Sequence, residues 1–432
     1  MTAPFTQLVQ IEKPVYGGAF LARVDGKAVF VPLALPGEVV RVRMMEEKRG
    51  YSTAEVEEVV TAAPERIAPT CGYFGACGGC SYQHADYATQ LKLKQAILRE
   101  TLARGGVEVP VELTVLAADS WGYRNRIRLA FDAAGNAGYR GRRSHTVVRV
   151  SECPIAAPLL IEAGLAFAEI ARNFAPALRA AEIALFCNAD ETALLASVFV
   201  GSPTGARFGE FGQALAERMP ALIGAELVME SRAEKRAETT QPRTIARWGA
   251  GSIHYRAAGF DYRVDHGAFF QVNRWLVDAL VERVTRGRKG ELAWDLFAGV
   301  GLFARKLAED FSRVVAVESA PGAIAALEEN LRGTSGTAVK AETLAFLRRN
   351  ISGARPDVIV ADPPRTGLGA EITALLARVA APAIVYVSCD PATLARDLKA
   401  LVSDGYAIES VALADLFPQT SHLESVVQLR RA

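Results

Sequence analysis

From about residue 290 the sequence alternates between short apolar runs and helical stretches, and this alternation limits the fold more than any other feature. Apolar runs with the character of buried strands recur at residues 292–301, 313–319, 356–365 and 383–390. Two more strand-like segments follow before the chain ends. Strands that alternate with helices in this way predict an α/β fold, in which a mainly parallel sheet is doubly wound by helices.

The first of these runs ends in DLFAGVG (295–301), a turn that predicts a ligand site. Gly299 and Gly301 allow the backbone to turn sharply and to approach a ligand closely. Glu318 ends the next strand, where its carboxylate can accept hydrogen bonds from both hydroxyls of a ribose. Leucine and phenylalanine follow the second glycine, so the GxGxxG fingerprint of dinucleotide-binding folds is not satisfied. S-adenosylmethionine (SAM), which has no pyrophosphate, fits a single tight turn better than flavin or nicotinamide, the alternative.

Further chemical groups are predicted at the same edge of the sheet. Asp362, in ADPPR (361–365), ends another strand, and open α/β folds bind ligands where their strands end. Cys389 follows the next strand and precedes a helix that starts at Pro391. A helix N-terminus favours a thiolate, so we expect a lowered pKa for Cys389. Glu424 begins the last strand, and the sequence alone does not show whether it reaches this site.

A thiol beside a SAM-binding turn points to one kind of methyl transfer. Carbon 5 of uracil is a weak nucleophile, but it becomes electron-rich once a thiolate has added to carbon 6. Carbon 5 can then take a methyl group, and a base must remove the carbon-5 proton before the thiolate leaves. An adenine amino-methyltransferase is the nearest alternative, because Asp-Pro-Pro loops occur there too, but that chemistry needs no thiol.

Six segments in order resemble the RNA uracil-5-methyltransferases: FFQVN (269–273), DLFAGVG, VVAVES, ADPPR, VSCDPATLARDL and FPQTSHLESVV. The resemblance implies a class I SAM-dependent methyltransferase fold with Cys389 as the nucleophile and Glu424 as the base. Cofactor contacts are implied at Gln271, Phe297, Glu318 and Asp362, with Gly299 and Gly301 shaping the turn. Three residues depart from the family's usual pattern without touching the thiol or the base: Leu302, Glu342 and Asp390.

Residues 1–64 form a separate pattern of short alternating runs between Gly, Pro and charged turns. Five short strands in so few residues predict a small β-barrel of the OB type. The segment resembles the TRAM domain of the same family. Because its charge is slightly negative, a barrel that binds RNA and a barrel that only packs on the rest of the chain are both open.

Four of the six cysteines fall into a pattern, with Cys71, Cys77 and Cys80 in CGYFGACGGC and Cys153 far downstream. Four thiolates fit either tetrahedral zinc or an iron–sulfur cluster, and spacing does not decide between them. The pattern resembles the family branch that carries a 4Fe–4S cluster and modifies large-subunit ribosomal RNA. That resemblance implies a cluster held by these four cysteines. The first gap is too long for radical SAM chemistry, so the predicted role is structural.

Two segments follow the cysteine run. Residues 87–105 show helical spacing with a glycine stop, and we expect the helical segment 87–114 to pack on the catalytic domain. Residues 121–150 hold seven arginines against one acid, with aromatic residues among them. This composition favours a surface for RNA phosphates and bases over a plain solvated sheet face.

The predicted organisation is an OB-like barrel over 1–64, a central RNA-binding α/β domain with the cysteines over 65–255, and a methyltransferase domain over 256–432. Lys and Arg number 49 and Asp and Glu 48, so a uniformly basic nucleic-acid binder is excluded. The first residues lack the pattern of a signal peptide, and no 18-residue stretch is free of polar breaks. We expect a cytoplasmic protein without a membrane segment or an obligate protein partner.

Together these patterns predict SAM-dependent methylation of carbon 5 of uridine in RNA, with 23S rRNA favoured as the substrate. Three alternatives remain open: tRNA as the substrate, methylation of an adenine amino group, and a non-catalytic RNA-binding iron–sulfur protein.

Overall fold

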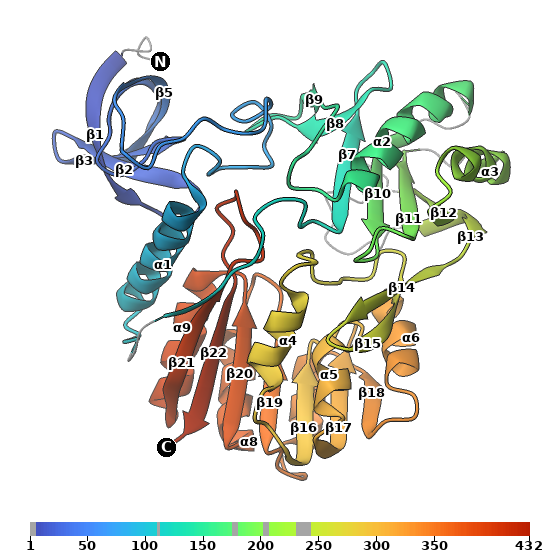
Figure 1. The fold of residues 1–432 in the computed structure, drawn as a ribbon. Coiled ribbons are helices and arrows are strands. Elements are labelled where there is room, and N and C mark those ends of the chain that lie inside the picture. Colours follow the sequence, from blue (N-terminus) through green and yellow to red (C-terminus); the bar gives the residue numbers. More distant parts are fainter. Residues whose placement is uncertain (1–5, 110–112, 175–179, 202–206, 230–242) are drawn as a thin grey trace.

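Three sheets follow one another along the chain in the computed structural model (Figure 1). It describes residues 6–109, 113–174, 180–201, 207–229 and 243–432. A barrel and a central sheet lie side by side above a larger sheet that holds the C-terminus. No helix among the described residues is long and apolar enough to cross a membrane.

The N-terminal strands close into a barrel in the order β1-β2-β3-β5-β4. The strands are β1 (Thr6–Pro14), β2 (Ala19–Val24), β3 (Lys27–Pro32), β4 (Val39–Glu47) and β5 (Tyr51–Thr61). Alternate side chains such as Val9, Ile11 and Phe20 fill its interior, as the two-residue period of a strand requires. The predicted five-stranded barrel is confirmed.

The central sheet has seven strands in the order β13-β12-β11-β10-β7-β8-β9. They are β7 (Arg126–Phe131), β8 (Ala137–Arg140), β9 (Val147–Arg149), β10 (Ala180–Cys187), β11 (Leu194–Val200), β12 (Leu222–Met229) and β13 (Arg243–Gly249). Helices α2 (Pro158–Ala171) and α3 (Phe208–Arg218) pack on it and contact each other, with the rings of Phe167 and Phe211 5.1 Å apart. Cys187 lies buried in the core of this sheet.

The C-terminal sheet has eight strands in the order β18-β17-β16-β19-β20-β22-β21-β6. The first five in this order are parallel: β16 (Gly290–Leu296), β17 (Phe311–Glu318), β18 (Gly336–Lys340), β19 (Val358–Ala361) and β20 (Ala383–Ser388). Strand β22 (Ser425–Arg431) runs antiparallel between β20 and β21 (Tyr406–Ala414). Strand β6 (Thr114–Leu116) joins the free edge of β21.

Helices cover both faces of this sheet and bury two separate apolar cores. One face carries α4 (Val277–Thr285), α5 (Leu302–Leu307) and α6 (Pro321–Asn330), together with the hairpin β14 (Ser252–Ala257) and β15 (Phe260–Asp265). The other carries α7 (Thr343–Asn350), α8 (Gly369–Val379) and α9 (Pro391–Ser403). The doubly wound α/β fold is therefore confirmed. The domain boundary expected after residue 255 falls within β14.

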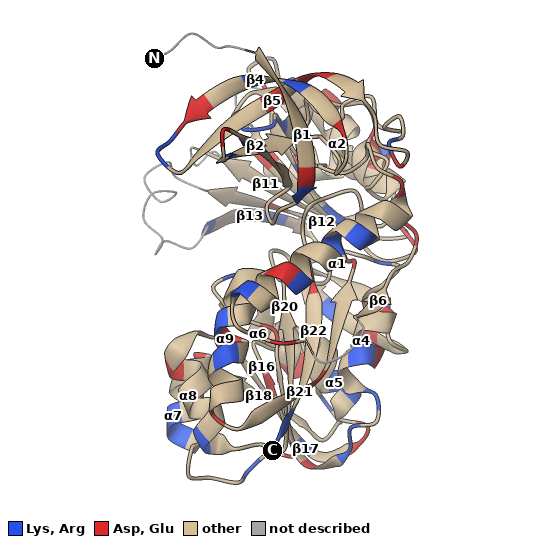
Figure 2. Ribbon diagram, turned by 90° about the vertical axis from the view of Figure 1, so that its left-hand side faces the viewer, with Lys and Arg blue, Asp and Glu red and all other residues tan. Residues whose placement is uncertain are grey.

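Helix α1 (Tyr87–Arg104) lies between the upper part of the molecule and the C-terminal sheet (Figure 2). It packs on α9, and Ile97 and Leu98 join the core on that face of the sheet. The expected helical segment 87–114 is too long. Two glycines end the helix: Gly105 lies so close to Ala395 that a Cβ there would be 2.6 Å from it, and Gly106 has φ +79°. Residues 110–112 lie outside the described residues, and the chain then enters β6.

Candidate active site

The DLFAGVG turn and Glu318 meet at the carboxyl edge of the C-terminal sheet. Phe297, Gly299 and Gly301 all have positive φ, at +63°, +56° and +90°. The Gly299 amide donates to Glu318 Oε2 at 2.8 Å, so the turn and the acid are held together. A Cβ on Gly301 would lie 2.7 Å from Leu327, so only glycine fits there.

Glu318 keeps acceptor capacity for a ligand. Its Oε1 accepts the amides of Ser319 and Ala320 at 2.7 and 2.6 Å. A carboxylate offers about four lone-pair sites, so oxygens that already bind amides can still accept ribose hydroxyls. The turn and the acid therefore fit the nucleoside end of SAM. Of the residues that depart from the family pattern, Leu302 is buried in the core and Glu342 is exposed before α7.

Asp295 is a site residue that the sequence analysis missed. It is fully buried at the end of β16, and its pKa is raised to about 8 by burial and by the charges of Asp362 and Glu318. Its Oδ2 accepts the Ala304 amide at 2.9 Å, whereas its Oδ1 has no partner among the described residues. An acid inside the apolar run LAWDLF was the signal that could have revealed it.

Gln271 lies beside Asp362, as a shared site requires. Its side-chain amide donates to Asp362 Oδ2 at 3.3 Å. Burial raises the pKa of Asp362 to about 7. The FFQVN segment is fixed by Asn125, whose side chain donates to the Gln271 carbonyl at 2.8 Å. Within the same segment Phe269 is 64% exposed, an unusual exposure for a ring so close to the site.

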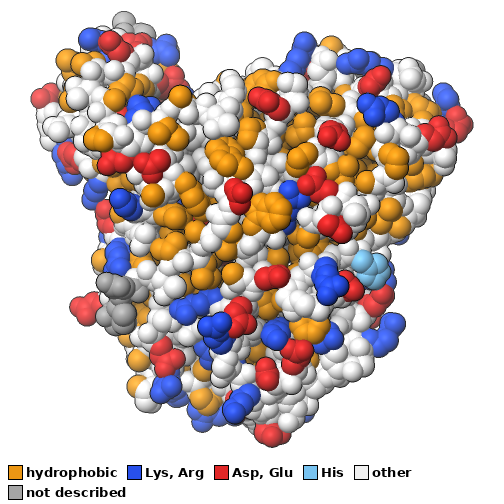
Figure 3. Space-filling view, viewed as in Figure 1, with side chains coloured by type: hydrophobic (Ala, Val, Ile, Leu, Met, Phe, Trp, Pro, Cys, Tyr) orange, Lys and Arg blue, Asp and Glu red, His pale blue; other side chains and the backbone are white. Residues whose placement is uncertain are grey.

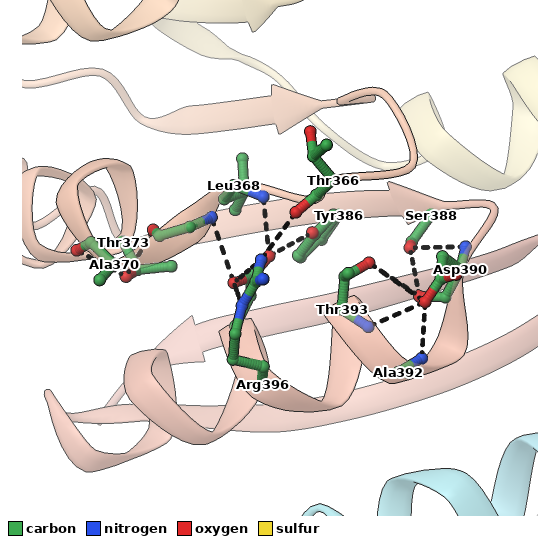
Figure 4. A network of polar contacts seen from close by, with 12 residues as sticks. Thr366, Leu368, Ala370, Thr373, Tyr386, Ser388, Asp390, Ala392, Thr393 and Arg396 are labelled. Atoms are coloured by element: carbon green, nitrogen blue, oxygen red, sulfur yellow. Dashed lines mark hydrogen bonds and ion pairs between the residues drawn. The ribbon is translucent and has the colours of Figure 1, made fainter.

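Cys389 lies in the turn between β20 and α9, and local hydrogen bonds fix its neighbours (Figure 4). Ser388 Oγ accepts the Asp390 amide at 3.3 Å. Asp390 Oδ1 then accepts the amides of Ala392 and Thr393, both at 2.9 Å, and so caps α9. Aspartate at this position, one of the departures from the family pattern, therefore has a clear structural use.

The expected lowering of the Cys389 pKa is wrong for the free protein. Burial, followed by the charges of Glu424 and Asp362, raises the pKa of this thiol to about 11. The Arg365 guanidinium opposes that rise only in part. The helix N-terminus that was expected to stabilise a thiolate is already occupied by the Asp390 carboxylate, so burial and the two acids decide the outcome.

Glu424 reaches the thiol, which the sequence could not show. It is buried directly before β22, and its Oε1 has no hydrogen-bond partner among the described residues. Burial and the neighbouring Asp362 raise its pKa well above the ordinary value. The structure thus brings Cys389, Glu424, Asp362 and Gln271 together at one sheet edge.

Three polar side chains around these groups were also missed. Arg365 donates to His422 Nδ1 at 3.2 Å, and burial together with Arg365 lowers the pKa of His422 to about 4, so this ring is neutral. Tyr16, from the loop between β1 and β2, donates to Asp390 Oδ2 at 3.0 Å. The barrel therefore contacts the residue next to the nucleophile.

The four patterned cysteines form a second site, called here the cysteine site: Cys71, Cys77, Cys80 and Cys153. They line one cavity of about 240 Å³, together with side chains of the central sheet. The Gly79 amide donates to Cys77 Sγ at 3.4 Å, and burial raises the pKa of Cys80 to about 12. No three His, Cys, Asp or Glu side chains in the described residues are arranged to hold a single ion. Four thiols around a cavity fit a wider metal group, whose charge would favour the thiolates.

The arginine-rich segment is less free to bind RNA than its composition predicts. Arg128 and Arg140 both pair with Glu182 of the neighbouring strand β10, each at 2.5 Å. Arg149 pairs with Asp132 at 2.7 Å. The sequence analysis counted charges within the segment and could not see the acid that strand pairing supplies.

Comparisons with known proteins agree with this site. Residues 350–432 match the family described as tRNA (Uracil-5-)-methyltransferase, and residues 5–56 match the TRAM domain. A 23S rRNA (uracil(1939)-C(5))-methyltransferase of Halomonas elongata is 34% identical over 97% of this chain and 88% of its own. An uncharacterized RNA methyltransferase of Streptomyces avermitilis is 34% identical over 98% of both chains. The chain belongs to the RNA uracil-C5 methyltransferase family.

The fold of this uracil-C5 methyltransferase has a counterpart among solved structures. A Pyrococcus abyssi tRNA (uracil-54, C5)-methyltransferase, solved with S-adenosyl-L-homocysteine, covers 98% of this chain and all of its own with a TM-score of 0.74. At 23% identity this likeness concerns the fold. Family membership decides between the activities that the motifs left open: the protein is an enzyme that methylates uracil, not an adenine amino group.

Proposed function

We propose that this enzyme methylates carbon 5 of a uridine in 23S rRNA through a covalent bond between Cys389 and carbon 6 of the uracil. The observation that carries the proposal is the meeting of a thiol and a buried carboxyl group, Glu424, at the edge of a SAM-type sheet. The sheet edge also provides Gln271 and Asp362 within hydrogen-bond distance of each other.

In this proposal each residue handles one bond or one proton. The Cys389 thiolate adds to carbon 6, and the electron pair of the double bond moves toward carbon 5. SAM, when bound, supplies the methyl group that carbon 5 accepts. Glu424 then takes the carbon-5 proton, the double bond re-forms and the thiolate leaves. Since the pKa of Glu424 is raised in the free enzyme, we expect substrate binding to leave this carboxyl ionised before it acts as a base.

The cofactor contacts are proposed on the same edge. Glu318 would hold the ribose, Phe297 and the turn at Gly299 and Gly301 would border the adenosine, and Asp362 with Gln271 would face the reacting end. Supporting geometry is the bond from Gly299 to Glu318 and the positive φ angles of the turn. Calorimetry with SAM tests this assignment: Glu318→Gln should weaken binding at least tenfold, and unchanged affinity would contradict it.

The choice of 23S rRNA rests on relatives more than 30% identical to this chain that are named for that substrate. Mapping 5-methyluridine by mass spectrometry in rRNA and tRNA, from cells with and without the protein, tests it. Loss of a methyl group from 23S rRNA supports the proposal. Loss from tRNA alone would reassign the substrate, and an unchanged map in both RNAs would refute the function.

We also propose that the cysteine site holds a 4Fe–4S cluster with a structural role. Its support is the set of four thiols around one cavity, next to a segment rich in glycine. Purified without oxygen, the protein should be brown and contain about four iron atoms per chain. A colourless protein with one zinc per chain would refute the cluster.

A further inference from the structure

Residues 415–424, called here the base loop, join β21 to Glu424 at the start of β22. Glu424 Oε1 has no hydrogen-bond partner, so the backbone of the loop has a large share in where this carboxyl group lies. A base must come within hydrogen-bond reach of the proton that it removes. Whatever fixes the base loop therefore also fixes the geometry of this step.

Helix α1 holds the base loop through buried side chains. Gln90 makes two bonds to one residue: its Nε2 donates to Gln419 Oε1 at 2.8 Å, and its Oε1 accepts the Gln419 amide at 2.9 Å. Lys94 donates to Asp415 Oδ1 at 2.5 Å and to the Phe417 carbonyl at 2.9 Å, and both charged groups of this ion pair are fully buried.

The segment after the cysteine site holds the same residue from the other side. The amides of Ser81 and Tyr82, directly after Cys80, donate to the Gln419 carbonyl at 2.9 and 3.0 Å. Gln419 has φ +67°, a conformation that residues with a side chain rarely adopt. Such a conformation persists where the surroundings determine it, and here four hydrogen bonds meet on one residue.

These contacts come from sequence positions more than 300 residues away and have no part in the proposed chemistry. We propose that Gln90, with the Lys94–Asp415 pair, acts as a set of positioning residues that keep Glu424 in place for removal of the carbon-5 proton. The proposal rests on the proposed function of Glu424. It assigns to helix α1 a role in one step of the reaction rather than in stability alone.

The order of the steps provides a test that a purely structural role would not satisfy. Thiolate addition and methyl transfer precede proton removal, so an enzyme with a misplaced base should stop as a covalent adduct of protein and methylated RNA. We expect Gln90→Met, which keeps the volume and removes both bonds to Gln419, to accumulate this adduct on ordinary uridine RNA with SAM. The adduct survives denaturing electrophoresis, and its amount should exceed that of the wild type about tenfold while turnover falls by a similar factor.

Gln95→Met is the matched control, because Gln95 lies on the same helix and bonds only to the Leu91 carbonyl. It should behave like the wild type. Normal turnover of Gln90→Met, or lost turnover without the adduct, would overturn the proposal. If Gln90→Met does not fold, the double variant Lys94→Met/Asp415→Asn, which leaves no buried charge unpaired, answers the same question.

Glu424→Gln separates this proposal from the function on which it rests. If Glu424→Gln accumulates the adduct and the α1 variants turn over normally, the positioning role fails and the proposed function stands. If Glu424→Gln accumulates no adduct and the wild type forms none with 5-fluorouridine RNA, the proposed function itself fails.

Discussion

The free enzyme should hold Cys389 as an unreactive thiol at neutral pH, and this can be measured directly. With a pKa of about 11, roughly one thiol in a thousand is ionised at pH 8. An unperturbed cysteine with a pKa of about 8.5 is about one-quarter ionised at that pH. Since only the thiolate is alkylated, iodoacetamide should modify Cys389 about two orders of magnitude more slowly than an ordinary cysteine.

The assay follows alkylation of the peptide that contains Cys389 by mass spectrometry between pH 7 and pH 10. The logarithm of the rate should rise by about one for each pH unit without a plateau, because the whole range lies below the pKa of the thiol. In Glu424→Gln the rate should rise faster toward the upper end. The wild-type carboxylate opposes the thiolate only after it has lost its own proton, and the pKa of Glu424 is itself raised.

Two results would refute this reasoning. A plateau at or below pH 8.5 in the wild type would mean that the N-terminus of α9 dominates over burial, as the sequence alone suggested. Identical rates for Glu424→Gln and the wild type at every pH would mean that the carboxyl group does not act on the thiol. Either result would require a different account of how the nucleophile is ionised.

Four other variants test separate parts of the site. Gly301→Ala should destabilise the protein by more than about 1 kcal/mol in urea unfolding and weaken SAM binding, because φ +90° and the side chain of Leu327 leave no place for a Cβ. Asp295→Asn should gain stability over the wild type by about 1.4 kcal/mol per unit between pH 5 and pH 8: the folded pKa of about 8 lies above the unfolded value, so ionisation in this range favours unfolding. Asp390→Ala should cost about 1 kcal/mol in urea unfolding through loss of the cap on α9, whereas Asp390→Asn should cost only a few tenths. Tyr16→Phe should slow adduct formation with 5-fluorouridine RNA and leave the calorimetric affinity for SAM unchanged, since the lost bond supports only the nucleophile turn.

Much of the C-terminal fold could be predicted because its strands are buried on both faces. Runs such as AIVYVS can be continuously apolar only where helices cover both sides, and the two apolar cores of the structure show that they do. The end of α1 was less accessible. The glycines that stop the helix are visible in the sequence, but the short strand β6 that follows pairs with β21, about 300 residues away.

The candidate site shows a similar division. The sequence indicates residues at strand ends, so Glu318, Asp362 and Cys389 could be placed at one edge of the sheet. It does not indicate how deeply a group is buried or which charges surround it. For that reason the direction of the Cys389 pKa was wrong and Asp295 was missed. Tyr16 was also missed, because its partner lies in another sheet and no local pattern connects them.

Both catalytic loops belong to the C-terminal sheet, yet each is fixed by a segment from the N-terminal part of the chain. The nucleophile turn receives a bond from Tyr16 of the barrel, and a Cβ on Gly18 of the same barrel loop would lie 2.9 Å from Ser421 of the base loop. The base loop is held by α1 through a buried ion pair. Breaking a buried pair by removing one partner typically costs about 3–5 kcal/mol, so α1 and the catalytic sheet should not separate easily.

This arrangement gives the N-terminal part of the chain two tasks. The exposed side chains above the sheet edge, where apolar groups gather between the barrel and the central sheet (Figure 3), are available for RNA. The buried contacts on the other side of the same segments hold the thiol and the carboxyl group at their separation. Because one set of elements does both, a force that RNA exerts on the barrel or on the cysteine segment is transmitted to the reacting groups through Asp390 and Gln419. We therefore expect RNA binding and catalytic geometry to be coupled in this enzyme, rather than supplied by independent modules.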